Sequence, residues 1–227
     1  MSGKTKSRLV LVYGRFERFW HWTQAALIIF LTLTGFEIHG SFTFFGYENA
    51  VNYHSVAAIL FLVLISFAIF WHFSTGEWKQ YVPTLSMLKA QAEYYVVGIF
   101  REAPHPTKKT VLSKLNPLQK MVYAGLKLLV IPGMVTTGLL YMFYRYPQKN
   151  EVMLLNVDGL RTIAVLHTLG AFALIAFIIA HIYLITTGDT ITSNLKAMIT
   201  GYEELEEETE SDSKREESPK KNKKGRS

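Results

Sequence analysis

The sequence predicts an all-α membrane protein built as a four-transmembrane-helix bundle. Hydrophobic residues make up 49% of the chain, and they fall into long blocks rather than a short repeating period. A block of about 20 apolar residues is enough to cross the hydrocarbon layer of a bilayer. The basic residues gather at the N-terminus and in one long loop, which is the charge asymmetry of a multi-pass membrane protein. The chain of 227 residues suits such a bundle and is too short for two large soluble domains.

Three regions follow one another along the chain. Residues 1–19 form a polar, basic, cytoplasmic N-terminal segment, and residues 20–187 form the membrane domain. Residues 188–227 form a charged tail, whose composition predicts disorder in the cytoplasm. The first apolar block is longer than a signal-peptide core and ends without a small-residue cleavage site. We therefore expect it to be retained as a membrane span.

The membrane domain is expected to contain four spans in order, at residues 20–39, 51–73, 118–144 and 160–187. Short loops at 40–50 and 145–159 alternate with a long inner loop at 74–117, which is rich in lysine and arginine. Basic loops face the cytoplasm, so the predicted topology is N-in/C-in. Apolar residues recur at helical spacing between residues 85 and 99, which predicts a helix at the inner membrane interface.

Two histidines in the last span, His167 and His181, lie 14 residues apart. A helix rises 1.5 Å per residue, so they are about 21 Å apart along the axis and only about 40° apart around it. Ionisable residues inside a membrane are costly and indicate function. Two imidazoles on one stripe at two depths suit two haem irons. The alternative is a pair of histidines hydrogen-bonded to neighbouring helices.

Cysteine is absent from the chain. This excludes disulfides, cysteine-ligated iron–sulfur clusters and covalently attached haem within this chain. Any haem would be held by histidine or methionine. The basic residues lie in loops and termini beside apolar blocks, so the positive net charge indicates membrane topology and no nucleic acid partner.

Each face of the predicted bundle has three histidines. Those near the inner face are His21, His72 and His181, and those near the outer face are His39, His54 and His167. A haem with two axial histidines needs both ligands at one depth. Spans one and two each carry their histidines 18 residues apart, which is about five helical turns. Periodicity alone therefore does not choose between His21 and His72, or between His54 and His39.

Five segments resemble one family of respiratory proteins. They are RFERFWHWTQ, NYHSVAA, LNPLQKMVY, VLHTLGA and IAHIYL, in this order. They are similar to the cytochrome b (gamma) subunit of membrane-bound respiratory formate dehydrogenase, and to the related cytochrome b subunits of hydrogenases and thiosulfate reductases. The resemblance covers residues 10–200 and all four spans. It implies a diheme cytochrome b in a bacterial or archaeal plasma (inner) membrane.

The resemblance also implies the haem ligands. It assigns His54 and His167 to an outer haem b, and His21 and His181 to an inner haem b. We call these residues the outer pair and the inner pair. Whether His39 or His72 replaces an assigned ligand stays open at this point.

A quinone site near the inner haem is implied as well. The matching residues are Asn116 and Gln119, and the quinone would be menaquinone or ubiquinone. Asn116 also has a purely structural interpretation, because asparagine followed by Pro117 is a favoured start of a helix. Gln119 needs no special reason at a membrane interface.

The implied function is electron transfer across the membrane, between a quinone and an outer-facing oxidoreductase. The partner subunit would carry iron–sulfur clusters or be a multihaem cytochrome c, and membrane lipid would surround the bundle. Substrate oxidation would take place in that partner, so this chain alone is not assigned an enzyme activity. The alternatives are a haem-based conduit without a quinone site, and a non-redox membrane anchor or transporter. The substrate, the direction of electron flow, the quinone type and the oligomeric state are not specified by the sequence.

Overall fold

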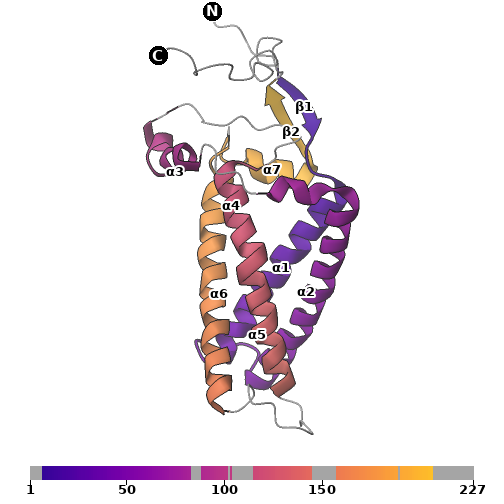
Figure 1. Ribbon diagram of the computed structural model, residues 1–227, viewed down its shortest axis with the longest axis vertical. Helices are drawn as coiled ribbons and strands as arrows, with labels where there is room; N and C mark the ends of the chain where they lie inside the picture. The colour runs from indigo at the N-terminus through magenta and orange to yellow at the C-terminus, as the bar shows by residue number, and fades with distance from the viewer. Residues whose placement is uncertain are drawn as a thin grey trace, which may run out of the picture.

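Four long helical segments run side by side in alternating directions (Figure 1). The computed structural model describes residues 7–82, 88–101, 103, 115–144, 157–188 and 190–206. The long segments are α1 (Arg15–Ile38), α2 (Tyr47–Thr75), the continuous run of α4 (Pro117–Gly125), η3 (Leu126–Val130) and α5 (Ile131–Tyr144), and α6 (Val157–Ile185). The first helix thus begins at Arg15, inside the segment 1–19 that we expected to precede the membrane domain.

Three segments of the described chain are long and apolar enough to cross a membrane. They are Tyr47–Thr75, Pro117–Tyr144 and Gly159–Ile185. The expected helical membrane protein is therefore confirmed. Helix α1 is not among these three, and its sequence explains why: it opens on aromatic and polar residues and carries Glu37 near its end. Its 24 residues span about 36 Å, so its length would allow a fourth crossing, which stays a prediction.

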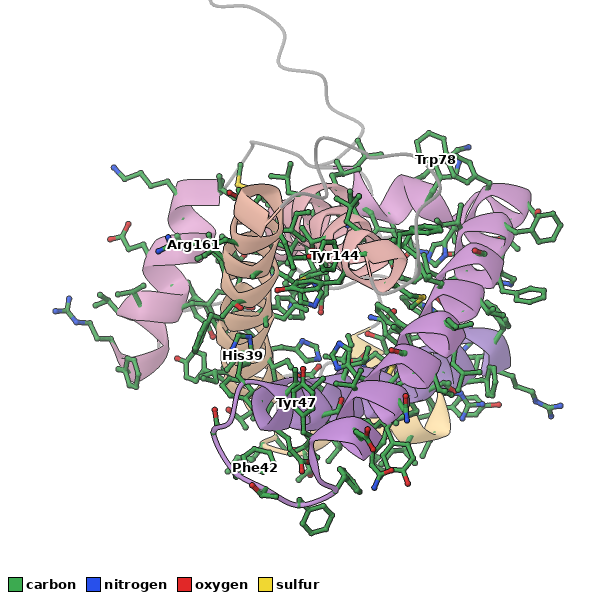
Figure 2. The ribbon with its side chains drawn as sticks, turned by 90° about the horizontal axis from the view of Figure 1, so that it is seen from below. His39, Phe42, Tyr47, Trp78, Tyr144 and Arg161 are labelled. Carbon is green, nitrogen blue, oxygen red and sulfur yellow. The ribbon has the colours of Figure 1, made fainter. Side chains whose placement is uncertain are left out.

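The long helices form two hairpins. Helix α1 packs along α2, and α5 packs along α6, whereas the two hairpins touch each other at few described positions. Figure 2 looks along the helices from the end that bears His39, Tyr47 and Tyr144, with α1 and α2 on one side and α5 and α6 on the other. Protein interiors are normally close-packed by large side chains. Here the buried apolar residues of the described chain are few and mostly small: Val12, Ala50, Ala57, Ala68, Leu126, Ile163 and Ala197.

The third long segment contains a widened turn. Residues Leu126–Val130 are π-helical, and the backbone N–H of Ile131 donates to the carbonyl of Leu126, five residues earlier. Pro132 follows this turn. A proline inside a helix removes one backbone donor and its ring collides with the carbonyl four residues before it, so the backbone must widen or bend there.

Glu37 fixes the loop between α1 and α2. Its Oε1 atom accepts hydrogen bonds from the backbone N–H groups of Phe44, Phe45 and Gly46, each at 2.7 Å. The residue is only 4% exposed. One carboxylate thereby satisfies three backbone donors just before α2 begins.

A small sheet joins the two ends of the described chain. Strand β1 (Ser7–Leu11) pairs antiparallel with β2 (Tyr202–Glu206), with Ser7 opposite Glu206 and Leu11 opposite Tyr202. Both strands lie at one end of the bundle (Figure 1). Because the chain begins and ends its helical part at the same end of the bundle, the number of helical passes between β1 and β2 is even. The sheet also adds a short β element to the expected all-α fold.

The region 188–227, expected to be disordered, contains regular structure in its first part. Helix α7 (Ser193–Thr200) precedes β2. The Arg18 Nη1 atom donates to the carbonyl of Ile199 at 2.6 Å, and the Trp22 Nε1 atom donates to that of Met198 at 3.2 Å. The expectation depended on the charged residues after 202, whereas α7 is mostly uncharged and docks on the start of α1. Residues 207–227 lie outside the described residues.

The described part of the loop expected at residues 74–117 contains three short helices. They are η1 (Glu77–Tyr81), α3 (Leu88–Val96) and η2 (Gly98–Arg101). Helix α3 falls within the stretch 85–99 that the sequence predicted to be helical. Tyr95 connects it to the bundle, since its backbone carbonyl accepts a hydrogen bond from the Tyr183 hydroxyl at 3.3 Å.

Candidate functional site

Two pairs of histidines face each other between the hairpins. The rings of His54 on α2 and His167 on α6 have centroids 6.3 Å apart. The rings of His21 on α1 and His181 on α6 have centroids 6.2 Å apart. Two imidazoles on opposite sides of one metal ion, each with a nitrogen about 2 Å from it, would have centroids about 6 Å apart. The structure thus brings together the residues of the outer pair and those of the inner pair.

Each histidine of the outer pair contacts a buried threonine hydroxyl. The Nδ1 atom of His54 lies 3.0 Å from Thr34 Oγ1, and that of His167 lies 2.8 Å from Thr137 Oγ1. Both hydroxyls also lie within hydrogen-bond distance of the carbonyl four residues earlier, at 2.9 Å for Thr34 and 2.7 Å for Thr137. Thr34 is 0% exposed and Thr137 is 9% exposed.

These contacts determine which ring nitrogen is free. A threonine hydroxyl has one hydrogen, and the backbone carbonyl of the preceding turn takes it. The hydroxyl oxygen must then accept the hydrogen bond from the histidine Nδ1–H, so Nε2 keeps its lone pair. Metal-bound histidines typically donate their second ring N–H in this way, which fixes the ring and its tautomer. The outer pair is therefore arranged as two metal ligands would be.

A glycine follows each threonine, and both glycines lie against a histidine ring. A methyl group added to Gly35 would be 3.4 Å from Cε1 of His54, and one added to Gly138 would be 3.4 Å from Cε1 of His167. None of these threonines and glycines was predicted from the sequence. The dipeptide Thr-Gly does not single them out, because it occurs five times in the chain, at residues 34–35, 75–76, 137–138, 187–188 and 200–201.

The inner pair has a different environment. The Tyr123 hydroxyl lies 3.1 Å from Nδ1 of His181, and Phe177 stacks on the same ring with centroids 5.6 Å apart and an interplanar angle of 13°. The Nδ1 atom of His21 is buried and has no hydrogen-bond partner among the described residues. The two rings of the inner pair are thus held differently.

Neither His39 nor His72 faces another histidine in the described structure. The Nε2 atom of the exposed His39 lies 2.9 Å from Thr168 Oγ1. The buried His72 has its Nδ1 atom 2.6 Å from the Ala68 carbonyl, and its ring meets those of Trp20 and Trp71 edge to face. These contacts of the two residues are therefore with threonine, backbone and aromatic groups rather than with a second histidine.

Asn116 and Gln119 cap the start of α4. The backbone N–H of Gln119 donates to Asn116 Oδ1 at 2.8 Å, and that of Asn116 donates to Gln119 Oε1 at 3.1 Å. Such a reciprocal arrangement satisfies donors that the first turn of a helix leaves free. The Asn116 Nδ2 atom also donates to the Tyr95 hydroxyl at 2.8 Å. The hydrogen bonds of Asn116 are therefore those of a residue that caps the start of a helix.

The donor set fits a haem. The described residues contain no group of three or more histidine or acidic side chains that could hold a bare metal ion. Two imidazoles at each level would leave the other coordination positions to a macrocycle, as in cytochromes with axial histidines. The orphan Nδ1 of His21 and the small number of buried apolar side chains also fit a bulky group between the hairpins.

An α-helical membrane bundle with paired histidines defines the class of membrane cytochromes. Residues 12–201 match the family described as prokaryotic cytochrome b561. The chain is 30% identical over 202 residues to the "Putative cytochrome YdhU" of Escherichia coli (strain K12), covering 85% of this chain and 74% of that protein. No solved structure matches the chain. The chain therefore belongs to the prokaryotic cytochrome b561 family, a family of membrane cytochromes that bind haem b.

This family membership confirms the coarser part of the sequence-based predictions. The chain is a bacterial membrane cytochrome b of the electron-transport class. The comparisons do not single out the formate dehydrogenase subunit among cytochromes of this kind.

Proposed function

We propose that the chain is a diheme cytochrome b subunit that carries electrons across the membrane, between an outer-facing oxidoreductase and a quinone near the inner pair. The observation that carries this proposal is the presence of two facing histidine pairs at two levels of one bundle. Helix α6 supplies one histidine to each pair, and the 14-residue separation puts the two levels about 21 Å apart.

The paired histidines and the residues that contact them each have a role in this electron transfer. His54 and His167 would hold one haem b, and His21 and His181 the other. Thr34 and Thr137 orient the outer pair, and Tyr123 orients His181. When bound, haem supplies a metal centre that exchanges one electron, while the protein sets its position and surroundings.

The proposal also covers the number of membrane crossings, the topology and the type of subunit. In this proposal α1 is a fourth crossing, and the chain is a multi-pass protein of the inner membrane with N-in/C-in topology. Its role would be like that of the gamma subunit of respiratory formate dehydrogenase. A chain without cysteine holds no iron–sulfur cluster through cysteine ligands. The outer-facing partner would therefore supply the clusters or the c-type haems.

The quinone would bind near the inner pair, beside Asn116 and Gln119. Asn116 stands seven residues, or about two helical turns, before Tyr123, which contacts His181. A conduit without a quinone site is the second candidate. It is favoured by the engagement of the Asn116 and Gln119 side chains in the helix cap. The two candidates differ in one result: Asn116→Ala and Gln119→Ala slow quinone-dependent turnover in the first and leave it intact in the second.

The test of the diheme function is a reduced-minus-oxidised absorbance spectrum of the purified protein, with haem quantified per chain. We expect two b-type haems in the wild-type protein. His54→Ala or His167→Ala should remove one haem, and His21→Ala or His181→Ala the other. His39→Ala and His72→Ala serve as controls that keep both. Loss of a haem in these controls, with both haems kept in His21→Ala and His54→Ala, would contradict the ligand assignment.

A further inference from the structure

Lys127 places an ionisable amine within the third long segment. It lies ten residues after Pro117, about 15 Å along the helix. Its Nζ atom lies 3.1 Å from the ring centroid of Tyr81 and 5.5 Å from that of Trp20. Among the described residues, this ammonium has no ion pair and no hydrogen bond beyond these aromatic contacts. A charge at such a depth is costly and indicates a functional role.

The backbone at Lys127 is also unusual. Lys127 is part of the π-helical turn Leu126–Val130. Such turns occur frequently at functional sites. Pro132 accounts for the presence of a widened turn but not for a lysine within it.

The indole N–H of Trp20, whose ring contacts Lys127, has no hydrogen-bond acceptor among the described residues. The Nε1 atom of this indole is buried. A buried N–H that is left unpaired is destabilising. Trp20 therefore contributes its ring to the Lys127 contact, while its N–H lacks an acceptor.

Tyr81 does not supply the missing negative charge. Burial raises the pKa of its phenol above the ordinary value, and the Glu17 carboxylate raises it further. The phenol therefore stays protonated at neutral pH, and it offers Lys127 a ring rather than an anion.

This cluster of Trp20, Tyr81 and Lys127 adjoins the inner pair. Trp20 precedes His21 in α1. Tyr123, one turn before Lys127, contacts the Nδ1 atom of His181. The lysine amine and the unpaired N–H thus lie on the segments of α1 and of the third long segment that carry His21 and the Tyr123 partner of His181.

We propose that Lys127 and Trp20 bind an acceptor oxygen of a ligand beside the inner pair. An oxygen with free lone pairs is what the ammonium and the indole N–H both lack. This inference rests on the proposed function, which offers two sources of such an oxygen: a carboxylate of the inner haem and a carbonyl of the quinone head group. If that oxygen belongs to the quinone, the head group lies beside Lys127 and Trp20 in place of the position beside Asn116 and Gln119.

The test compares five substitutions in the haem-loaded protein. Lys127→Met removes the charge, and Trp20→Phe removes the N–H but keeps an aromatic ring. The matched controls are Lys120→Met, two turns earlier in the same segment, and Trp22→Phe, whose N–H is already bound to the Met198 carbonyl. Lys127→Arg, which keeps the charge, should restore most of the wild-type behaviour.

Two measurements distinguish the sources of the oxygen. The first is the midpoint potential of each haem, and the second is the apparent KM for haem reduction by menadiol. If the ligand is a quinone, Lys127→Met and Trp20→Phe raise this KM at least fivefold and leave the potentials unchanged. If it is a haem carboxylate, Lys127→Met lowers the potential of one haem, because a cation that favoured the added electron is gone, and the KM is unchanged.

The proposal is wrong if Lys127→Met and Trp20→Phe leave both quantities at wild-type values, or if the controls change them equally. Trp20→Phe alone decides the matter if Lys127→Met does not fold. A wild-type protein that binds no haem would contradict the proposed function. That outcome is distinct from a haem-loaded wild type on which these substitutions have no effect.

Discussion

The four histidines of the outer and inner pairs differ in the hydrogen-bond partner of their Nδ1 atom. His54 and His167 each have a threonine hydroxyl that accepts from Nδ1, and His181 has the Tyr123 hydroxyl. His21 has no such partner in the described structure. A partner on the second nitrogen raises the basicity of a metal ligand and fixes its orientation. The ligand properties of the two pairs therefore differ.

Removal of a threonine hydroxyl should weaken the outer haem. In Thr34→Val the side chain keeps its volume, but the His54 Nδ1–H is left without an acceptor. We expect the affinity for one haem to fall by about 10- to 100-fold, the usual effect of losing such a partner. Haem titration of the haem-depleted protein measures this, and Thr34→Ser should restore binding. Thr32→Val is the control, since this hydroxyl contacts only the Ile28 carbonyl.

The same reasoning applies to Thr137→Val at the other histidine of the pair. Both variants should change the same haem, identified by its absorbance band and midpoint potential. If Thr34→Val and Thr137→Val affected different haems, His54 and His167 would not share one.

Glu37 should matter for stability rather than for haem affinity. Its Oε1 atom accepts three hydrogen bonds at 2.7 Å from the loop before α2. Glu37→Gln removes the charge and should lower the free energy of unfolding by about 1–3 kcal/mol. Thermal unfolding in detergent measures the loss. Glu48→Gln, at an exposed position in the first turn of α2, should have a smaller effect, and an equal effect would contradict this role of Glu37.

The histidines could be predicted from the sequence and the threonines could not, for a physical reason. A histidine in an apolar block is rare because its burial is costly, so its position alone carries information. A threonine in a membrane helix normally bonds to its own backbone, as Thr32 does. Only the three-dimensional structure shows that the second lone pair of Thr34 and Thr137 reaches a ring on the neighbouring helix.

At the scale of elements, the long helices and the short helix α3 were predictable, whereas α7 and the two strands were not. Apolar length sets the positions of α2, α5 and α6, because about 20 apolar residues suffice to cross a bilayer. Helix α7 and strands β1 and β2 depend instead on contacts between the two ends of the chain, which no local pattern reveals. The π-turn before Pro132 is intermediate: proline predicts a distortion but not its form.

Gly201 should be essential for the docking of α7 and β2. Its φ is +91°, and a methyl group added there would lie 2.7 Å from the Tyr13 carbonyl oxygen. Gly201→Ala should therefore destabilise this end of the protein by about 1–3 kcal/mol. Faster proteolysis after α6 would report the loss. Gly125→Ala is the control, because its added methyl group meets no atom within 4 Å, and equal proteolysis of both variants would contradict the prediction.

At the scale of the whole molecule, the two hairpins are well packed internally and poorly packed against each other. The family of the chain binds haem b, and the paired histidines lie between the hairpins. The sequence predicted long apolar helices, and three segments of the described chain are long and apolar enough to cross a membrane. The looseness between the hairpins was not predictable, since hydropathy describes each helix alone and not what fills the space between helices.

Haem removal should therefore reduce stability more than any single substitution. A ligand present at about 1,000 times its Kd stabilises the folded state by about 4 kcal/mol. We expect the haem-depleted protein to unfold at a clearly lower temperature in detergent and to recover when haem is added back. His54→Ala, with one haem lost, should fall between the two. Equal unfolding temperatures with and without haem would show that the hairpins hold together by themselves.

Each histidine pair takes one member from α1 or α2 and the other from α6. Under the proposed function, neither half of the chain could assemble a cofactor site alone, and α6, the last of the long helices to leave the ribosome, would complete both. A gene split within residues 83–114 would yield two fragments, each colourless by itself. Fragments that insert independently and then meet would regain the red absorbance of the intact protein, so colour would report the joining of the two halves.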